Sequence, residues 1–69
     1  MVRNIIEIGT VLYGPRFQRE LADALGVNER TMRRLVAGSA EPPASLTHDL
    51  LRLVLARRAT LDKIITRLQ

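Results

Sequence analysis

Apolar residues recur at helical spacing along most of the chain, and no segment alternates apolar and polar residues as a half-buried strand does. The first such stretch predicts a helix from Val2 to Tyr13, in which Gly9 is a weak point. Gly14-Pro15 is expected to end it, and Pro15 suits the first turn of a second helix from Pro15 to Leu25. The pattern therefore predicts an all-α fold.

A tight turn is expected directly after the second helix. Gly26 suits a left-handed residue that closes a helix, and Asn28 is a natural N-cap for a third helix from Glu29 to Ala37. Ala22 supplies the small residue that two steeply crossing helices need where their backbones approach. Residues 15–37 therefore have the order and spacing of a helix-turn-helix unit.

The remaining sequence predicts two more helices after a loop at residues 38–43. One runs from Ala44 or Ser45 to about Arg57, and Arg58-Ala59 suggests a break, with Thr60 as the N-cap of a short last helix. One apolar stripe of that last helix contains Leu61, Ile64, Ile65 and Leu68. These residues either cover the core of the monomer or form a two-fold dimer interface. The expected fold is a compact five-helix bundle and a single domain of residues 1–69, with residues 44–68 contributing core and dimer interface.

The third helix is expected to have two chemically different sides, at about 100° of rotation per residue. The apolar side carries Met32, Leu35 and Val36, and the opposite side carries Arg30, Arg33 and Arg34. Arginine pairs well with guanine, and Glu29 could accept a hydrogen bond from cytosine or orient a neighbouring arginine. The alternative is an ordinary solvated face in which Glu29 and Arg33 form an i, i+4 pair.

Charge agrees with a polyanionic partner, because the 69 residues have a formal net charge of +4 and a pI near 11.1. Ten of the eleven basic residues are arginine, which suits bidentate contacts but equally suits a GC-rich genome. Arg16 and Gln18 open the second helix, where side chains and backbone N–H groups could hold a phosphate. For Arg16, Gln18 and Asn28 a purely structural role stays open, and for Asn28 that role is the cap.

Residues 12–43 resemble the phage Cro/CI-type (Xre-like) helix-turn-helix transcriptional regulators. The resemblance is carried by Leu12-Tyr13-Gly14-Pro15-Arg16-Phe17, Leu21-Ala22, Leu25-Gly26-Val27, Arg30-Thr31-Met32-Arg33-Arg34 and the loop from Gly38 to Pro42. It implies a five-helix domain that binds an operator as a dimer and represses transcription, and it suggests a small anti-CRISPR-associated repressor. Phe17 and Leu35 stand where many members have tryptophan, so the operator sequence does not follow from the resemblance.

The same resemblance matches individual positions. Gln18 corresponds to a glutamine that contacts phosphate, and residues 29, 30, 33 and 34 correspond to base-facing positions of the recognition helix. The residues expected to bind DNA are Arg16, Gln18, Asn28, Glu29, Arg30, Thr31, Arg33 and Arg34, and those expected at the dimer interface are Leu61, Ile64, Ile65 and Leu68. The expected partners are double-stranded DNA and a second copy of the chain.

Other functions are less well supported by the sequence. An antitoxin or phage adaptor that binds a protein through the C-terminal helices is the main alternative, and RNA binding is weaker because no aromatic residues interleave with the arginines. Enzymatic activity, a metal site, a cofactor and a small-molecule ligand are not expected, since cysteine is absent and His48 is the only histidine. With no recognisable signal peptide, and a longest apolar run of Leu53 to Ala56, a soluble cytoplasmic protein is expected.

Overall fold

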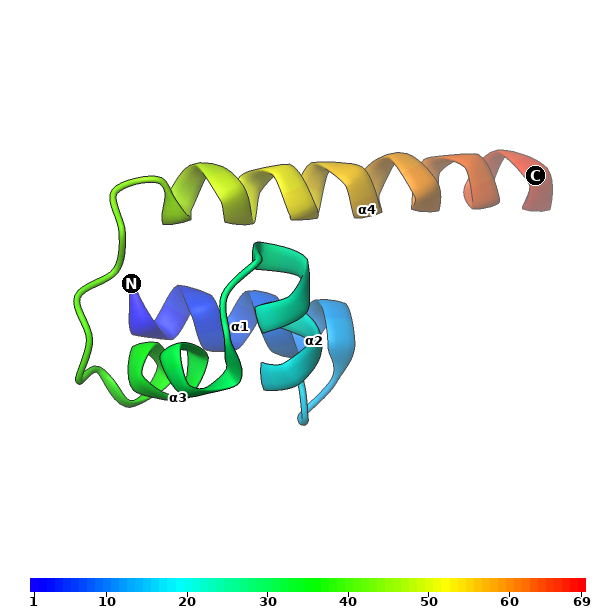
Figure 1. Ribbon diagram of the computed structural model, residues 1–69. Helices are drawn as coiled ribbons and strands as arrows, with labels where there is room; N and C mark the ends of the chain where they lie inside the picture. The colour runs from blue at the N-terminus through cyan, green and yellow to red at the C-terminus, as the bar shows by residue number, and fades with distance from the viewer.

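The computed structural model describes all 69 residues, and every regular element in it is a helix. The four helices are α1 (Val2–Tyr13), α2 (Gln18–Leu25), α3 (Glu29–Ala37) and α4 (Leu46–Leu68) (Figure 1). The predicted all-α class and the bounds of the first and third helices are confirmed. The prediction of five helices is wrong.

The two C-terminal helices expected from the sequence are one continuous helix. No glycine or proline lies between Leu46 and Leu68, and Arg58 and Ala59 are good helix formers. Thr60 does not cap a new helix, because its Oγ1 donates to the carbonyl oxygen of Ala56 at 3.3 Å, one turn earlier. The hydroxyl group is thereby satisfied inside the helix, and α4 continues through the expected break.

This single helix makes the molecule elongated, with principal extents of 45 × 23 × 19 Å. α4 has 23 residues and is therefore about 34 Å long. Figure 1 shows α1, α2 and α3 gathered beside its first half, while its C-terminal half projects beyond them. The expected compact bundle is replaced by a small globular body with a projecting helix. None of the four helices combines the length and apolar character needed to cross a bilayer.

The core draws side chains from all four helices and from the residue that precedes α2. Its buried members are Ile5, Phe17, Leu21, Ala22, Met32, Leu35, Leu46 and Leu50. Gly9 is also buried in α1, and a methyl group added there would collide with the ring of Phe17. The weak point that Gly9 makes in α1 is therefore the place where the only phenylalanine packs.

The second helix starts later than predicted, at Gln18 instead of Pro15. Pro15 and Arg16 form a turn after Gly14, whose φ of 88° is the left-handed region that glycine tolerates. This turn brings Phe17 to the N-cap position with its side chain buried, and its carbonyl oxygen accepts the first helical hydrogen bond, from Leu21 N–H at 2.8 Å. Core packing of Phe17 thus fixes where α2 begins.

The turn between α2 and α3 follows the sequence prediction. Gly26 is left-handed with a φ of 74°, and its N–H donates to the carbonyl oxygen of Asp23 at 3.2 Å. The N–H of Val27 donates to the carbonyl oxygen of Ala22 at 3.0 Å, which completes a Schellman motif. Ala22 is fully buried at this point. Only Gly26, Val27 and Asn28 separate the two helices, and α2 and α3 pack against each other.

Arg57 ties α4 to the end of α1. Its guanidinium donates to the carbonyl oxygen of Leu12 at 3.1 Å and lies 5.7 Å from the centroid of the Tyr13 ring. The last carbonyl groups of a helix lack partners within it, and a cation there also suits the helix dipole. Arg57 therefore holds α1 and α4 in register just before α4 leaves the body.

Candidate nucleic-acid interface

Asn28 sets the start of α3. Its backbone is extended, and its Oδ1 accepts a hydrogen bond from the N–H of Thr31 at 2.7 Å. This is the N-cap geometry that the sequence predicted. The cap occupies the side-chain oxygen of Asn28 and the backbone N–H of Thr31, whose side chain is half-buried. Contacts of these two residues with DNA remain predictions, and the cap alone accounts for Asn28.

The two sides of α3 lie as the helical rotation predicted. Met32 and Leu35 are buried against the body, and Val36 packs at the edge of the core. Arginine side chains cover the opposite side, where Arg30, Arg33 and Arg34 are all exposed. α3 packs on α1 and α2 with no Cα atom within 8 Å of one in α4, and Figure 1 shows it at the side of the body away from α4. The arginine side of α3 is thus open to solvent.

Glu29 lies between two arginines from different helices. Its carboxylate is 3.9 Å from Arg33, one turn along α3, and 3.7 Å from Arg19 on α2. Their side chains are 52%, 63% and 80% exposed, in the order Glu29, Arg33, Arg19. Glu29 was expected either to orient a neighbouring arginine or to accept a hydrogen bond from a base. Its carboxylate lies beside two arginines, as the first role requires. Contact with a base remains a prediction.

Sequence reasoning missed Arg19. It is an exposed residue in the first turn of α2, beside a buried stripe, and such a residue is ordinarily solvated. The two arginine–glutamate distances show that α2 contributes a cation to the same surface as α3. In the sequence Arg19 is only a charged residue with no obvious partner. Its proximity to Glu29 depends on how α2 and α3 cross.

Arg16 and Gln18 lie at the entrance to α2. Arg16 is exposed in the turn before the helix, not inside it, and Gln18 is the first helical residue and half-buried. Phe17, between them, points into the core. The N–H groups in the first turn of a helix have no partners within it and carry a partial positive charge. The entrance to α2 therefore combines a cation, an amide side chain and free backbone donors.

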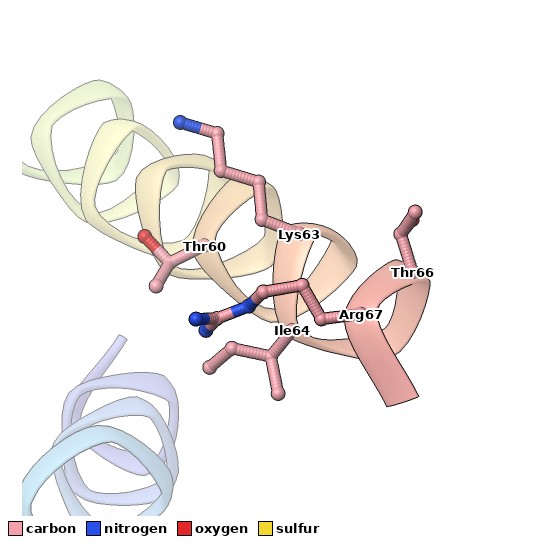
Figure 2. Close-up of a pocket in the computed structure, with 5 residues that line it drawn as sticks. All are labelled: Thr60, Lys63, Ile64, Thr66 and Arg67. Carbon is pink, nitrogen blue, oxygen red and sulfur yellow. The ribbon is translucent and has the colours of Figure 1, made fainter. Parts of the chain in front are cut away.

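Other candidate chemistry is sparse. His48 is exposed in α4, and the chain brings together no group of three or more histidine, cysteine or acidic residues that could hold a metal ion. A shallow hollow near the end of α4 is lined by residues of that helix alone (Figure 2): Thr60, Lys63, Ile64, Thr66 and Arg67. A hollow on one side of a single helix encloses nothing.

The apolar residues near the C-terminus are not part of the core. Leu61, Ile65 and Leu68 are exposed, and Ile64 is half-buried. The interpretation that this stripe covers the monomer core is therefore wrong, because α4 carries it past the ends of α1 and α2. The interpretation as an interface remains a prediction.

No family model, curated protein or solved structure matches this chain. The role of the arginine surface is therefore inferred from its position and charge. Arginines 30, 33 and 34 are exposed on α3, and Glu29 lies between Arg33 and Arg19 of α2, which also carries the exposed Glu20 and Asp23. The three arginines on the exposed side of α3 favour a polyanion as the partner.

Proposed function

We propose that the protein is a sequence-specific DNA-binding repressor that acts as a homodimer, with residues 15–37 as a helix-turn-helix unit. The observation that carries this proposal is the division of α3. Met32 and Leu35 fix the helix to the body, while Arg30, Arg33 and Arg34 face solvent on the other side. The B-DNA major groove is wide enough for such a helix, and arginine reads guanine O6 and N7 there through paired hydrogen bonds.

Each part of the surface has a separate task in this proposal. Arg30, Arg33 and Arg34 reach base edges, and Glu29 holds Arg33 in place or accepts from cytosine N4. Contacts with phosphate position the protein without reading sequence, and the entrance to α2 supplies them through Arg16 and Gln18. Arg19 joins this second group because it is exposed beside Glu29.

The proposed operator follows from symmetry. A two-fold dimer presents two copies of α3, so the bound DNA is an inverted repeat with half-sites roughly one helical turn, about 34 Å, apart. Repression then results from blocking the access of RNA polymerase to a promoter that overlaps the operator. The earlier resemblance to Cro/CI-type regulators, including small anti-CRISPR-associated repressors, points in the same direction.

The test compares Arg33→Ala with Arg52→Ala on an operator enriched from a random duplex library. Arg52 is an exposed arginine on α4, away from the arginine side of α3, so its substitution removes the same charge elsewhere. Loss of one arginine–guanine contact costs about 1–3 kcal/mol, or roughly 5- to 150-fold in Kd, and relaxes the preference at one base pair of a half-site. Equal effects of the two substitutions would reduce the arginine surface to a general electrostatic attraction.

A second candidate function is a protein-interaction module such as an antitoxin or phage adaptor. The exposed stripe of Leu61, Ile65 and Leu68 favours it, because apolar surface of this kind is normally covered by a partner. It is compatible with DNA binding by α3. A chain that stays monomeric and selects no DNA sequence would favour this function over the repressor.

A further inference from the structure

α4 carries a second apolar stripe that is separate from its core stripe. The core stripe contains Leu46, Leu50 and Leu53. The other, called the outer stripe here, consists of five apolar residues and Arg58, alternately three and four residues apart: Leu51, Val54, Arg58, Leu61, Ile65 and Leu68. Four of its leucine and isoleucine side chains are exposed by 49–82%. Such spacing is typical of a seam between two packed helices, and the monomer provides no second helix for it.

An apolar groove lies beside the first half of the outer stripe. It runs between α1 and α4, with Ile8 and Val11 on one side and Leu51 and Val54 on the other. Val11 is 76% exposed, so the groove is open to solvent. The groove follows α1, whose 12 residues are about 18 Å long. The part of α4 beyond Arg57, residues 58–68, is called the overhang here and is about 16 Å long. The overhang and the groove therefore have matching lengths.

We propose that the groove of each chain is filled by the overhang of a second copy, with the two α4 helices antiparallel. The spacing of the outer stripe defines the register: Leu51 packs beside the partner's Leu68, Val54 beside the partner's Ile65, and Arg58 beside the partner's Leu61. Ile64, at the edge of the overhang, then faces the partner's α1. The inference rests on the proposed function, because it defines the interface of the proposed dimer.

The position of the grooves favours the antiparallel arrangement. A parallel pair would leave both grooves empty, whereas in both arrangements Arg58 comes within about one turn of its own copy. In the antiparallel register Arg58 lies beside the partner's Leu61, with the partner's Asp62 next along the helix. Glu7 lines the part of the groove next to Val54 and Leu61, which this register places opposite residues 58–65 of the partner's α4.

The same arrangement suits DNA. The core stripe and the outer stripe of α4 are separated by about 100° around the helix. Two antiparallel helices joined through the outer stripe therefore have both globular bodies on the same side of their common plane. α3 lies in each body on the side away from α4 (Figure 1), so the two-fold axis places both copies of α3 on the same side of the dimer. One duplex can contact both.

Disulfide trapping tests the register without interference from native thiols, because the chain contains no cysteine. In Val54→Cys combined with Ile65→Cys, the antiparallel register brings each cysteine beside one of the partner's, and oxidation is expected to give a covalent dimer. With Val54→Cys or Ile65→Cys alone, the two cysteines lie about 16 Å apart along the helices and stay reduced. Cross-linking of either single variant would show a parallel pair and overturn the proposal.

Sedimentation equilibrium measures the oligomeric state without introduced cysteines, and so tests the pairing even if the cysteine variants disturb it. The wild-type chain is expected to be a dimer. Ile65→Asp is expected to be a monomer with unchanged helical circular dichroism, because Ile65 contributes nothing to the core. The control is Lys63→Asp, on the other side of α4 from Ile64 (Figure 2), which is expected to stay dimeric. A monomeric wild-type chain, or a dimer that tolerates Ile65→Asp, would overturn the proposal.

Cross-linking and sedimentation are measured without DNA, so they test the pairing of α4 independently of DNA binding by α3. Failure of the pairing leaves DNA binding by α3 standing, as a monomer or with another interface. Failure to find an operator leaves the pairing of α4 standing. Only success of both supports a dimer that places two copies of α3 on one operator.

Discussion

Replacing Glu29 by glutamine is expected to change stability and DNA binding in opposite directions. The substitution keeps the shape of the side chain and removes the carboxylate that lies between Arg19 and Arg33. That carboxylate is also in the first turn of α3, where a negative charge suits the helix dipole. Its loss weakens the folded state and makes the arginine surface more positive.

The expected loss of stability is small. The two ion pairs have long separations, 3.7 and 3.9 Å, and all three side chains are more than half exposed, so each pair contributes at the lower end of about 0.2–1 kcal/mol. The helix dipole adds about 0.3–1 kcal/mol. The free energy of unfolding should therefore fall by about 1 kcal/mol, which lowers the Tm by roughly 4–8 °C in a domain of this size.

The expected gain is in binding to DNA of random sequence. Without its carboxylate neighbour, Arg19 or Arg33 is free to contact a phosphate. One added phosphate contact steepens the slope of log K against log salt by about 1. Affinity for random duplex should rise at low salt, and the ratio of operator to random affinity should fall.

Fluorescence anisotropy over a salt series measures the gain, and urea unfolding followed by circular dichroism measures the loss. Glu41→Gln is the matched control, because Glu41 is exposed in the loop before α4 and has no ion-pair partner. An unchanged salt slope for Glu29→Gln, or the same change in the control, would refute a role for Glu29 in shaping the DNA-binding surface.

Two further substitutions test the supports of the site. Gly9→Ala should lower the free energy of unfolding, measured in urea, by up to about 2 kcal/mol, because the new methyl group meets the buried Phe17 ring. Helix propensity alone predicts a gain of about 1 kcal/mol, and such a gain would contradict that packing. Asn28→Ala should lose about 1 kcal/mol with the cap, whereas Asn28→Ser keeps it. If both Asn28 variants bind an operator as the wild type does, Asn28 is a cap only; an equal loss of affinity in both would show that its amide contacts DNA.

Local signals explain what the sequence predicted well. Gly26 and Asn28 each act through their own backbone or a neighbour three residues away, so the turn before α3 could be predicted from a few residues. The two sides of α3 followed from helical rotation for the same reason. Both predictions needed only contacts between residues close in sequence.

Contacts between distant residues explain what the sequence did not predict. Pro15 is equally suitable for a turn and for a first helical turn, and the burial of Phe17 decides between them. Thr60 is a good N-cap and also a tolerated helical residue, and the hydrogen bond to Ala56 shows which role it has. Arg19 joined the site only through the crossing of α2 and α3.

The stripe near the C-terminus shows a third case. Its helical spacing predicted one apolar face but not what covers that face. Since α4 continues unbroken, the face is carried beyond the body, and core packing no longer accounts for Leu61, Ile65 and Leu68. The length of the helix, which sequence reasoning underestimated, therefore excludes the core interpretation, and the interface interpretation stays a prediction.

The most direct test of the account is the selection of bound sequences by the wild-type chain from a random duplex library at about physiological salt. The account predicts an enriched inverted repeat whose half-sites are roughly one helical turn apart, as two copies of α3 on a two-fold dimer require. Recovery of DNA with no enriched motif would contradict it, since only the electrostatic attraction of a basic surface would then remain.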